Sequence, residues 1–263
     1  MRAQELLDYF RSLDGGWVYR EHTVDTFKAG DPATEVRGIA VGWMSYTWAL
    51  RRAVELGCNV FVTHEPTYYS HRDNDESVWN YAGARSKRDF IEANQLVILR
   101  CHDLWDQFPH LGIPDAWAEF LGFSHPRVSE GYYRVFDGNG ETAHSLAQRV
   151  ASRTAALGQA SVQLLGPANK PIHRVALGTG ALTPFRHFLD AYQCDLAICT
   201  DDGFTYWRDG ALAIDLEIPV IVVNHAVSEI YGIQKLADHL AEKFSTIPVH
   251  HIPQTCMYQL VSA

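Results

Sequence analysis

The amino-acid sequence predicts an α/β protein with two α/β domains and mixed sheets. Its 263 residues allow one or two domains at a typical size of about 150 residues each. Short apolar runs of strand length alternate with longer segments in which apolar residues recur at helical spacing, a pattern typical of α/β folds. Residues 124–131 (SHPRVSEG) lack apolar periodicity and indicate a boundary. We therefore predict a first domain at 1–125, a second at 126–222, and a C-terminal segment, 223–263, that returns to the first domain.

Three apolar runs in the first half are short enough to be buried strands. They lie at residues 37–42 (RGIAVG), 59–63 (NVFVT) and 96–100 (LVILR). Helical spacing of apolar residues predicts helices at 3–12, 45–56, 79–94 and 113–121. Ser45 is a suitable N-cap for the second helix, and Gly57 is a suitable end. Residues 64–78 carry many polar groups with little periodicity, so we predict a loop there.

The second half continues the same alternation. Strands are expected at 132–136, 160–165, 173–178, 195–199, 218–223, 247–252 and 256–261. Helices are expected at 142–156, 182–192, 206–216 and 226–243. Asp137-Gly138-Asn139-Gly140, which follows the first of these strands, predicts a turn.

The composition is that of an acidic globular protein. A formal net charge of −9 and a pI of about 5.8 disfavour non-specific attraction to nucleic acid or anionic lipid. No apolar stretch approaches the roughly 20 residues of a membrane-spanning helix, and the N-terminus MRAQELLDYF is not that of a signal peptide. The five cysteines form no CxxC pair and are expected as buried free thiols. We predict a cytoplasmic protein without membrane or nucleic-acid partners.

The first cluster of candidate functional residues is Thr63-His64-Glu65-Pro66, directly after the strand NVFV. Ligands of open α/β sheets bind beyond the carboxyl ends of the strands, so this position favours a site. His64 offers a nitrogen and Glu65 a hard oxygen, both ordinary ligands of first-row divalent metals. Neighbouring side chains point apart, so each residue can serve a different ion. The alternative is a His-Glu pair on the surface of a turn.

The second cluster is His102-Asp103-Leu104-Trp105-Asp106, which follows the strand LVILR. It again places a histidine and carboxylates just beyond the end of a buried strand. The alternative is that Asp103 and Asp106 cap the following turn.

The third cluster, residues 224–229 (NHAVSE), follows the strand IPVIVV and opens a helix. His225 and Glu229 are four residues apart, so they lie on one helix face and can share a metal. The alternative is that Glu229 is favoured by the dipole at the start of the helix, and that His225 forms ordinary hydrogen bonds within the fold.

The conjunction of three such clusters favours a metal site over three unrelated alternatives. Each cluster follows a strongly apolar strand and pairs a histidine with a carboxylate within four residues. Five ligands with three carboxylates are more than one tetrahedral zinc needs, so we predict two divalent ions per chain: Zn, Mn or Fe. The predicted ligands are His64, Glu65, Asp106, His225 and Glu229.

On these residues the chain resembles the NIF-three-like dinuclear-metal family, also known as type-two GTP cyclohydrolase one. Family members carry Thr-His-His-Pro after a strand, where this chain has Thr63-His64-Glu65-Pro66. They carry His-x-x-x-Asp after another strand, here His102 to Asp106, and Gly-His-x-x-x-Glu near the C-terminus, here Asn224-His225 to Glu229. The run RGIAVGWMSYTWALRRAVELGCNVFVTHEP resembles the opening strand-helix-strand of the family, and the similarity covers most of the chain.

The resemblance implies a NIF-three-like pair of α/β domains, a toroidal homohexamer and two divalent metals per subunit. By position it assigns the ligand roles to the same five residues. Glu65 stands where the family has its second histidine, and a carboxylate there shifts the preference towards harder metals such as Mn or Fe. The change Glu65→His restores the family pattern and is expected to keep both metals.

Two functional hypotheses follow. The first is a metal-dependent hydrolase, GTP cyclohydrolase-like, that acts on a nucleotide, a phosphoester or a ring-containing small molecule. In that enzyme His102 is the general base or a group that orients a metal ligand. The second is a non-catalytic metal-binding or regulatory oligomer that binds protein partners. Turnover that depends on metal would separate the two.

Overall fold

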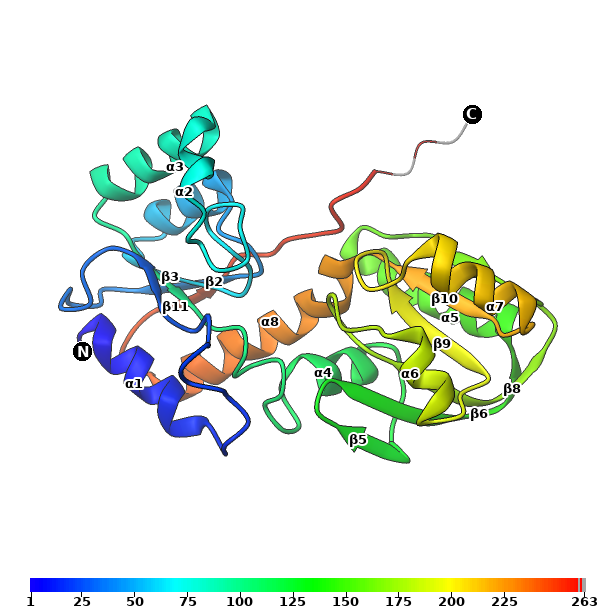
Figure 1. Cartoon of the computed structure of the whole chain (residues 1–263). Helices are drawn as coiled ribbons and strands as arrows, with labels where there is room; N and C mark the ends of the chain where they lie inside the picture. The colour runs from blue at the N-terminus through cyan, green and yellow to red at the C-terminus, as the bar shows by residue number, and fades with distance from the viewer. Residues whose placement is uncertain (260, 262–263) are drawn as a thin grey trace. The chain divides into compact units, whose positions relative to one another are not determined.

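The chain forms two compact units, each built on one mixed sheet with helices on both faces (Figure 1). The computed structural model describes residues 1–259 and 261. The first unit comprises Met1–Phe108 and Ile233–Gln254, and the second Pro109–Gly232 and Thr255–Ala263. The predicted α/β class with two mixed sheets is confirmed. The division at residues 125 and 222 stays a prediction about independently folding domains.

The sheet of the first unit has the strand order β1-β4-β3-β2-β11. Its strands are β1 (Phe27–Ala29), β2 (Ile39–Gly42), β3 (Val60–Thr63), β4 (Val97–Arg100) and β11 (Val249–His251). β2, β3 and β4 run parallel, and their last residues, Gly42, Thr63 and Arg100, lie in register at one edge. The residues that follow these three strands therefore meet at that edge.

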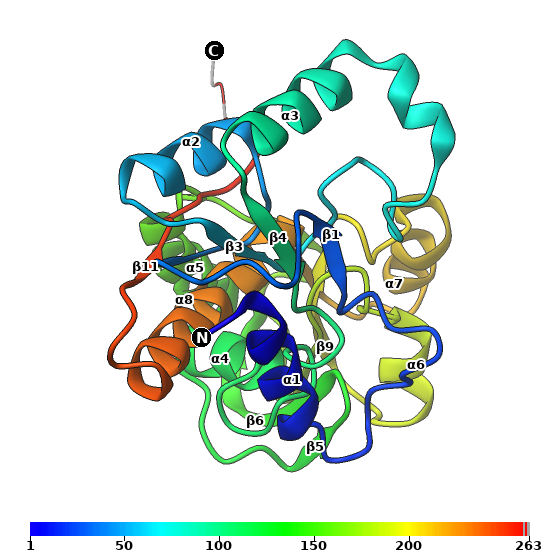
Figure 2. The same ribbon diagram turned by 90° about the vertical axis from the view of Figure 1, so that its left-hand side faces the viewer.

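Helices cover both faces of this sheet. Strands β2, β3 and β4 are therefore buried at every position, as is usual for parallel strands. Figures 1 and 2 show α2 and α3 on one face and α1 on the other. The core under α2 and α3 contains Leu50, Phe61, Ile91 and Ile98. The helical elements are α1 (Ala3–Leu13), α2 (Thr47–Glu55), the 3-10 turn η1 (Glu76–Asn80), α3 (Ala82–Ala93) and the part of α8 (His225–Lys243) from Ile233 on.

The sheet of the second unit has the strand order β5-β6-β8-β9-β10-β7. Its strands are β5 (Val128–Glu130), β6 (Tyr133–Thr142), β7 (Gln163–Leu165), β8 (Pro171–Leu177), β9 (Leu196–Thr200) and β10 (Val220–Val223). β9 and β10 are parallel, with Thr200 opposite Val223, so the residues after these strands also share an edge.

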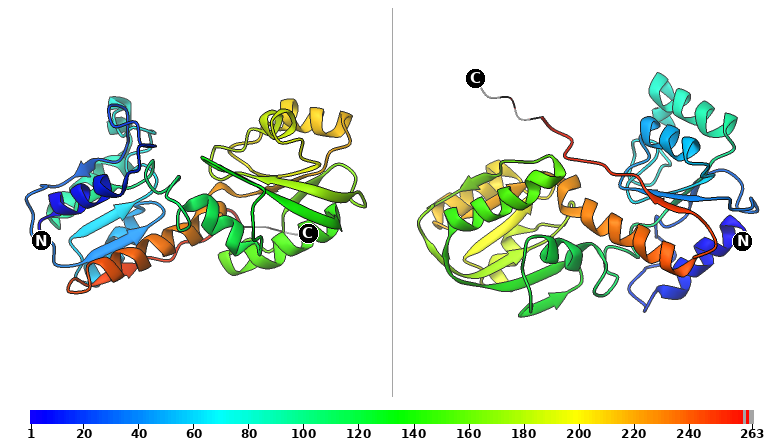
Figure 3. Two further views of the ribbon diagram at one scale, coloured as in Figure 1. Left: turned by 90° about the horizontal axis from the view of Figure 1, so that it is seen from below. Right: turned by 180° about the vertical axis from the view of Figure 1, so that it is seen from behind.

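Alternate residues of this second sheet face two separate cores. Phe136, Val175 and Ile198 pack with α4 and α5, whereas Ala176 and Ala197 pack with α6 and α7. Figure 3 shows α5 (green) on one face of the sheet and α6 and α7 (yellow to orange) on the other. The helical elements are α4 (Ile113–Phe120), α5 (Ala143–Thr154), η2 (Ala155–Leu157), α6 (Phe185–Asp190), η3 (Tyr206–Gly210), α7 (Ala211–Asp215) and the start of α8.

Several local predictions were wrong. Ser45 does not cap α2, whose N-cap position is Tyr46, because the Ser45 hydroxyl donates to Thr67 Oγ1 instead. The turn expected at 137–140 is part of strand β6, because a register shift between Asp137 and Glu141 absorbs the glycines while pairing with β8 continues. The short strands β1 and β5 were not anticipated, since each has only three residues and neither carries an apolar run. The strand expected at 256–261 is absent from 256–259 and 261, and Leu260 lies outside the described residues.

Two other expectations concern the chain as a whole. All five cysteines are free, as predicted, and four of them are buried. Within the described part of the chain, no helix combines the length and hydropathy that crossing a bilayer requires.

Candidate metal centre

His64 and Asp106 face each other at the carboxyl edge of the first unit's sheet. His64 follows β3 directly and is completely buried. Its Nδ1 lies 3.1 Å from the carbonyl oxygen of Cys101, which can only accept, so Nδ1 carries a proton. In the neutral ring Nε2 then presents its lone pair to Oδ1 of Asp106, 3.3 Å away. Two electron-rich atoms at this distance need a cation between them or a second proton on the ring, and they form a donor pair that suits a divalent metal.

His102 completes a group of three ligand-type side chains in this unit. Its ring stacks on that of His64, with centroids 4.6 Å apart. The ligand-type atoms of His64, His102 and Asp106 all lie within 4.8 Å of one another. Nδ1 of His102 lies 2.9 Å from Asp103 and 3.5 Å from Oδ2 of Asp106. Burial by itself lowers the pKa of His102, but these two carboxylates outweigh it, and the pKa lies above its ordinary value.

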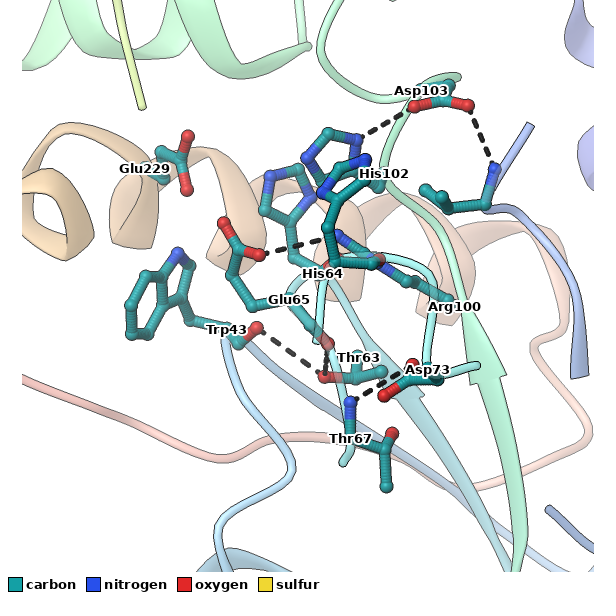
Figure 4. A network of polar contacts seen from close by, with 12 residues as sticks. Trp43, Thr63, His64, Glu65, Thr67, Asp73, Arg100, His102, Asp103 and Glu229 are labelled. Atoms are coloured by element: carbon teal, nitrogen blue, oxygen red, sulfur yellow. Dashed lines mark hydrogen bonds and ion pairs between the residues drawn. The ribbon is translucent and has the colours of Figure 1, made fainter. Parts of the chain in front are cut away.

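A buried carboxylate, Asp25, anchors the loop that carries this group. It accepts hydrogen bonds from the backbone N–H groups of His102 (2.6 Å), Asp103 (3.0 Å) and Leu104 (2.8 Å). Burial and the neighbouring Asp103 carboxylate raise the pKa of Asp25. Asp103 in turn accepts from the N–H of Val24 at 3.1 Å, and Figure 4 shows its contact with His102. Sequence reasoning missed Asp25, which lies 77 residues from His102 and outside any recognisable motif.

Glu65 forms an ion pair with Arg100, the last residue of β4 (Figure 4). Nη2 of Arg100 lies 3.3 Å from Oε2 of Glu65. The backbone of Glu65 is held as well, because its carbonyl accepts a 2.9 Å hydrogen bond from Thr63 Oγ1. Sequence reasoning also missed Arg100, although an arginine that ends the apolar run LVILR was a visible signal.

His71 also lies beside this group, and the sequence did not single it out. Its ring lies edge-on to that of His102, with centroids 5.9 Å apart. Burial, Arg100 and His102 together lower the pKa of His71. It lies in the predicted polar loop, where no spacing rule distinguished it.

In the second unit, His225 and Glu229 form the predicted pair on one face of α8. Nε2 of His225 lies 3.2 Å from Oε2 of Glu229, and Nδ1 lies 3.1 Å from Asp202. A neutral imidazole has one N–H for these two carboxylates, so one contact requires a second proton or a metal. Asp201 accepts the backbone N–H of His225 at 2.8 Å and so caps the helix. A side chain at Gly180, whose φ is +56°, would press on both Glu229 and His225.

Each unit brings part of the predicted set of site residues together. In the first unit, His64, Asp106 and His102 form one cluster. Glu65 lies at the same edge of the sheet, where it pairs with Arg100 at the end of β4. In the second unit, His225 pairs with Glu229. Helix α8 begins with that pair, and from Ile233 on its residues belong to the first unit.

The family model of Duf34/NIF3 (NGG1p interacting factor 3) matches residues 1–256. The chain belongs to the Duf34/NIF3 family. This confirms the family that the sequence motifs indicated. A search of the curated proteins found no match.

Several solved structures are similar to this member of the Duf34/NIF3 family over nearly its whole length. The Bacillus cereus protein related to NIF3 has a TM-score of 0.83 at 13% identity, with 99% of each chain covered. Staphylococcus aureus protein SA1388 has a TM-score of 0.81 at 14% identity, also with 99% of each chain covered. Reduced HcgD from Methanocaldococcus jannaschii has a TM-score of 0.72 at 16% identity, with 98% of each chain covered. At these identities the likeness shows a shared fold.

Proposed function

We propose that this protein is a dinuclear metal-binding protein that works as a metal-dependent hydrolase on a nucleotide, a phosphoester or a ring-containing small molecule. The observation that carries the proposal is the contact between His64 and Asp106. A histidine nitrogen whose partner nitrogen is bound to a backbone carbonyl faces a carboxylate oxygen at 3.3 Å. Histidines that bind metals are oriented in this way, with the other ring N–H donated to a carbonyl or carboxylate.

The proposed ligands are the five residues that the sequence indicated. His64, Glu65 and Asp106 come from the first unit, and His225 and Glu229 from the second. Three carboxylates and two imidazoles suit Zn, Mn or Fe, and the three carboxylates neutralise much of the charge of two divalent ions. Two such ions supply Lewis-acid activation of a phosphoryl or carbonyl oxygen and of a water molecule.

The protein's own part of the chemistry centres on His102. Asp103 and Asp106 hold a proton on Nδ1 and fix the ring orientation, which leaves Nε2 to exchange a proton with substrate or water. The two neighbouring carboxylates raise the pKa of His102 above its ordinary value despite its burial. We assign His102 the role of a general base that takes a proton from water or substrate, or of a group that orients a metal ligand.

The test combines metal analysis with a hydrolysis screen. Purified protein reconstituted with Zn, Mn or Fe should hold about two equivalents, more than a single structural zinc. His64→Ala should lose metal and turnover together, whereas His144→Ala, at an exposed position on α5, should change neither. Retention of both equivalents by His64→Ala would contradict the proposal.

The alternative function is a regulatory oligomer that binds metal without catalysis. One surface observation favours self-association in either case: Tyr206, Trp207 and Ile214 are 78%, 67% and 60% exposed on η3 and α7. Large apolar side chains of this kind are enriched at protein interfaces. We propose a homohexamer, and light scattering should report six copies. Metal binding without turnover on any substrate of the screen would favour the regulatory function.

A further inference from the structure

Arg100 connects three parts of the loop that follows β3. It is completely buried, and each of its three guanidinium nitrogen atoms has a hydrogen-bond partner. Figure 4 shows the contact with Glu65. Nε donates to the carbonyl of His64 at 2.7 Å, Nη1 donates to the carbonyl of His71, and Nη2 pairs with Oε2 of Glu65. One side chain therefore fixes the backbone on both sides of Glu65 and one oxygen of its carboxylate.

The two carbonyls are neutral, so the charge balance of Arg100 depends on Glu65. Among the described residues, Glu65 is the carboxylate within ion-pair distance of this guanidinium. A buried ion that loses its partner is strongly unfavourable, because water cannot replace the lost carboxylate. Lysine cannot take the place of arginine here, since it lacks the planar fork that serves three acceptors at once.

We propose that Glu65 and Arg100 act as one coupled unit in which Arg100 is a positioning residue for the metal ligand Glu65. Arg100 holds Oε2, so the carboxylate is oriented before a divalent ion arrives, and its positive charge balances the negative charge of Glu65. The inference rests on the proposed function and deepens it. It also changes the expectation that Glu65→His keeps both metals bound. That change alone leaves a buried guanidinium without its carboxylate beside a divalent cation.

The experiment is a double-mutant cycle on the full chain with Glu65→His, Arg100→Gln and the double variant. Calorimetric titration with Mn²⁺ measures stoichiometry and dissociation constants. We expect Glu65→His to bind one equivalent at least about tenfold more weakly than the wild type, because the unpaired guanidinium repels the ion. In the double variant the repulsion is gone, and binding should recover to within about threefold of the wild type.

A purely structural role of Arg100 predicts the opposite pattern. Its loss would then weaken binding by the same factor in both backgrounds, and the double variant would be the weakest. Arg134→Gln is the matched control, since Arg134 is also buried with one carboxylate partner, Asp115, and two backbone carbonyls. It should lower the melting temperature without changing the Mn²⁺ titration. Additive effects in the cycle, or two equivalents bound tightly by Glu65→His, would overturn the inference.

Thermal melting of the metal-free protein keeps the inference testable if the Arg100→Gln variants do not fold. Glu65→Gln is nearly isosteric but neutral, so it should lower the melting temperature by several degrees, whereas Glu65→Asp should lower it less. An unchanged melting temperature for Glu65→Gln would refute the coupling of the pair. If Glu65→Gln clearly lowers the melting temperature but the wild type binds no metal, the proposed function is refuted and the coupling of Glu65 with Arg100 stands.

Discussion

Asp25→Ala should remove the anchor of the loop that carries His102 and Asp106. Three backbone N–H groups, those of His102, Asp103 and Leu104, lose a carboxylate acceptor in this variant. Asp25 is 7% exposed and Leu104 2%, so water replaces these bonds incompletely. A hydrogen bond to a charged group contributes about 1.5–3 kcal/mol. Because water can partly replace the carboxylate at the N–H groups of His102 and Asp103, we expect the unfolding free energy to fall by about 3–5 kcal/mol in total.

Asp25→Asn provides a graded comparison. Oδ1 accepts two of the three bonds, so an asparagine with its oxygen in that place keeps them and sets an NH2 group against the N–H of Leu104. The expected loss is about 1–3 kcal/mol. Asp31→Ala is the control, because Asp31 is exposed and accepts a single backbone bond, from Ala33, so the change should cost less than about 1 kcal/mol.

Urea denaturation measures these differences, and Mn²⁺ titration measures their effect on the site. Because the loop positions Asp106, Asp25→Ala should weaken metal binding by about 10–100-fold, as other changes behind a ligand do. If Asp25→Ala unfolds within about 1 kcal/mol of the wild type, or behaves like Asp31→Ala, the anchoring role is refuted.

Three further changes test other parts of the structure. Asp106→Asn removes a charged ligand opposite His64 and should weaken metal binding by more than about 100-fold in calorimetry; an unchanged titration would argue against its ligand role. Gly180→Ala forces a side chain at a φ of +56° against Glu229 and should cost more than about 2 kcal/mol, against about 1 kcal/mol for Gly140→Ala, where φ is +75° and the space is open. Equal losses in urea denaturation would contradict the close packing. Burial lowers the pKa of Lys87, whose ammonium donates to the carbonyl of Thr67, to about 8. The folded state then releases this proton at lower pH than the unfolded state does. The unfolding free energy of the wild type should therefore rise relative to Lys87→Met by about 1–3 kcal/mol between pH 8 and 10.5, and a flat difference would show that burial does not shift the group.

The sequence by itself determined the elements whose signal is local. Strands β2, β3 and β4 were found as short apolar runs because each is buried at every position. The positions of His64 and His102 followed from those strands, since a residue just beyond a strand end lies at the sheet edge whatever the rest of the fold does. The pairing of His225 with Glu229 needed only the helical repeat.

The tertiary structure alone decided which distant residues support these groups. Asp25 meets the His102 loop across 77 residues, and Arg100 meets Glu65 across 35. The strand β6 continues through a glycine-rich segment because β8 lies beside it, although the segment by itself favours a turn. Such contacts depend on strand register and on burial against elements far away in the chain. No local pattern of residue types records that information, because the same carboxylate or arginine at the surface would look identical in the sequence.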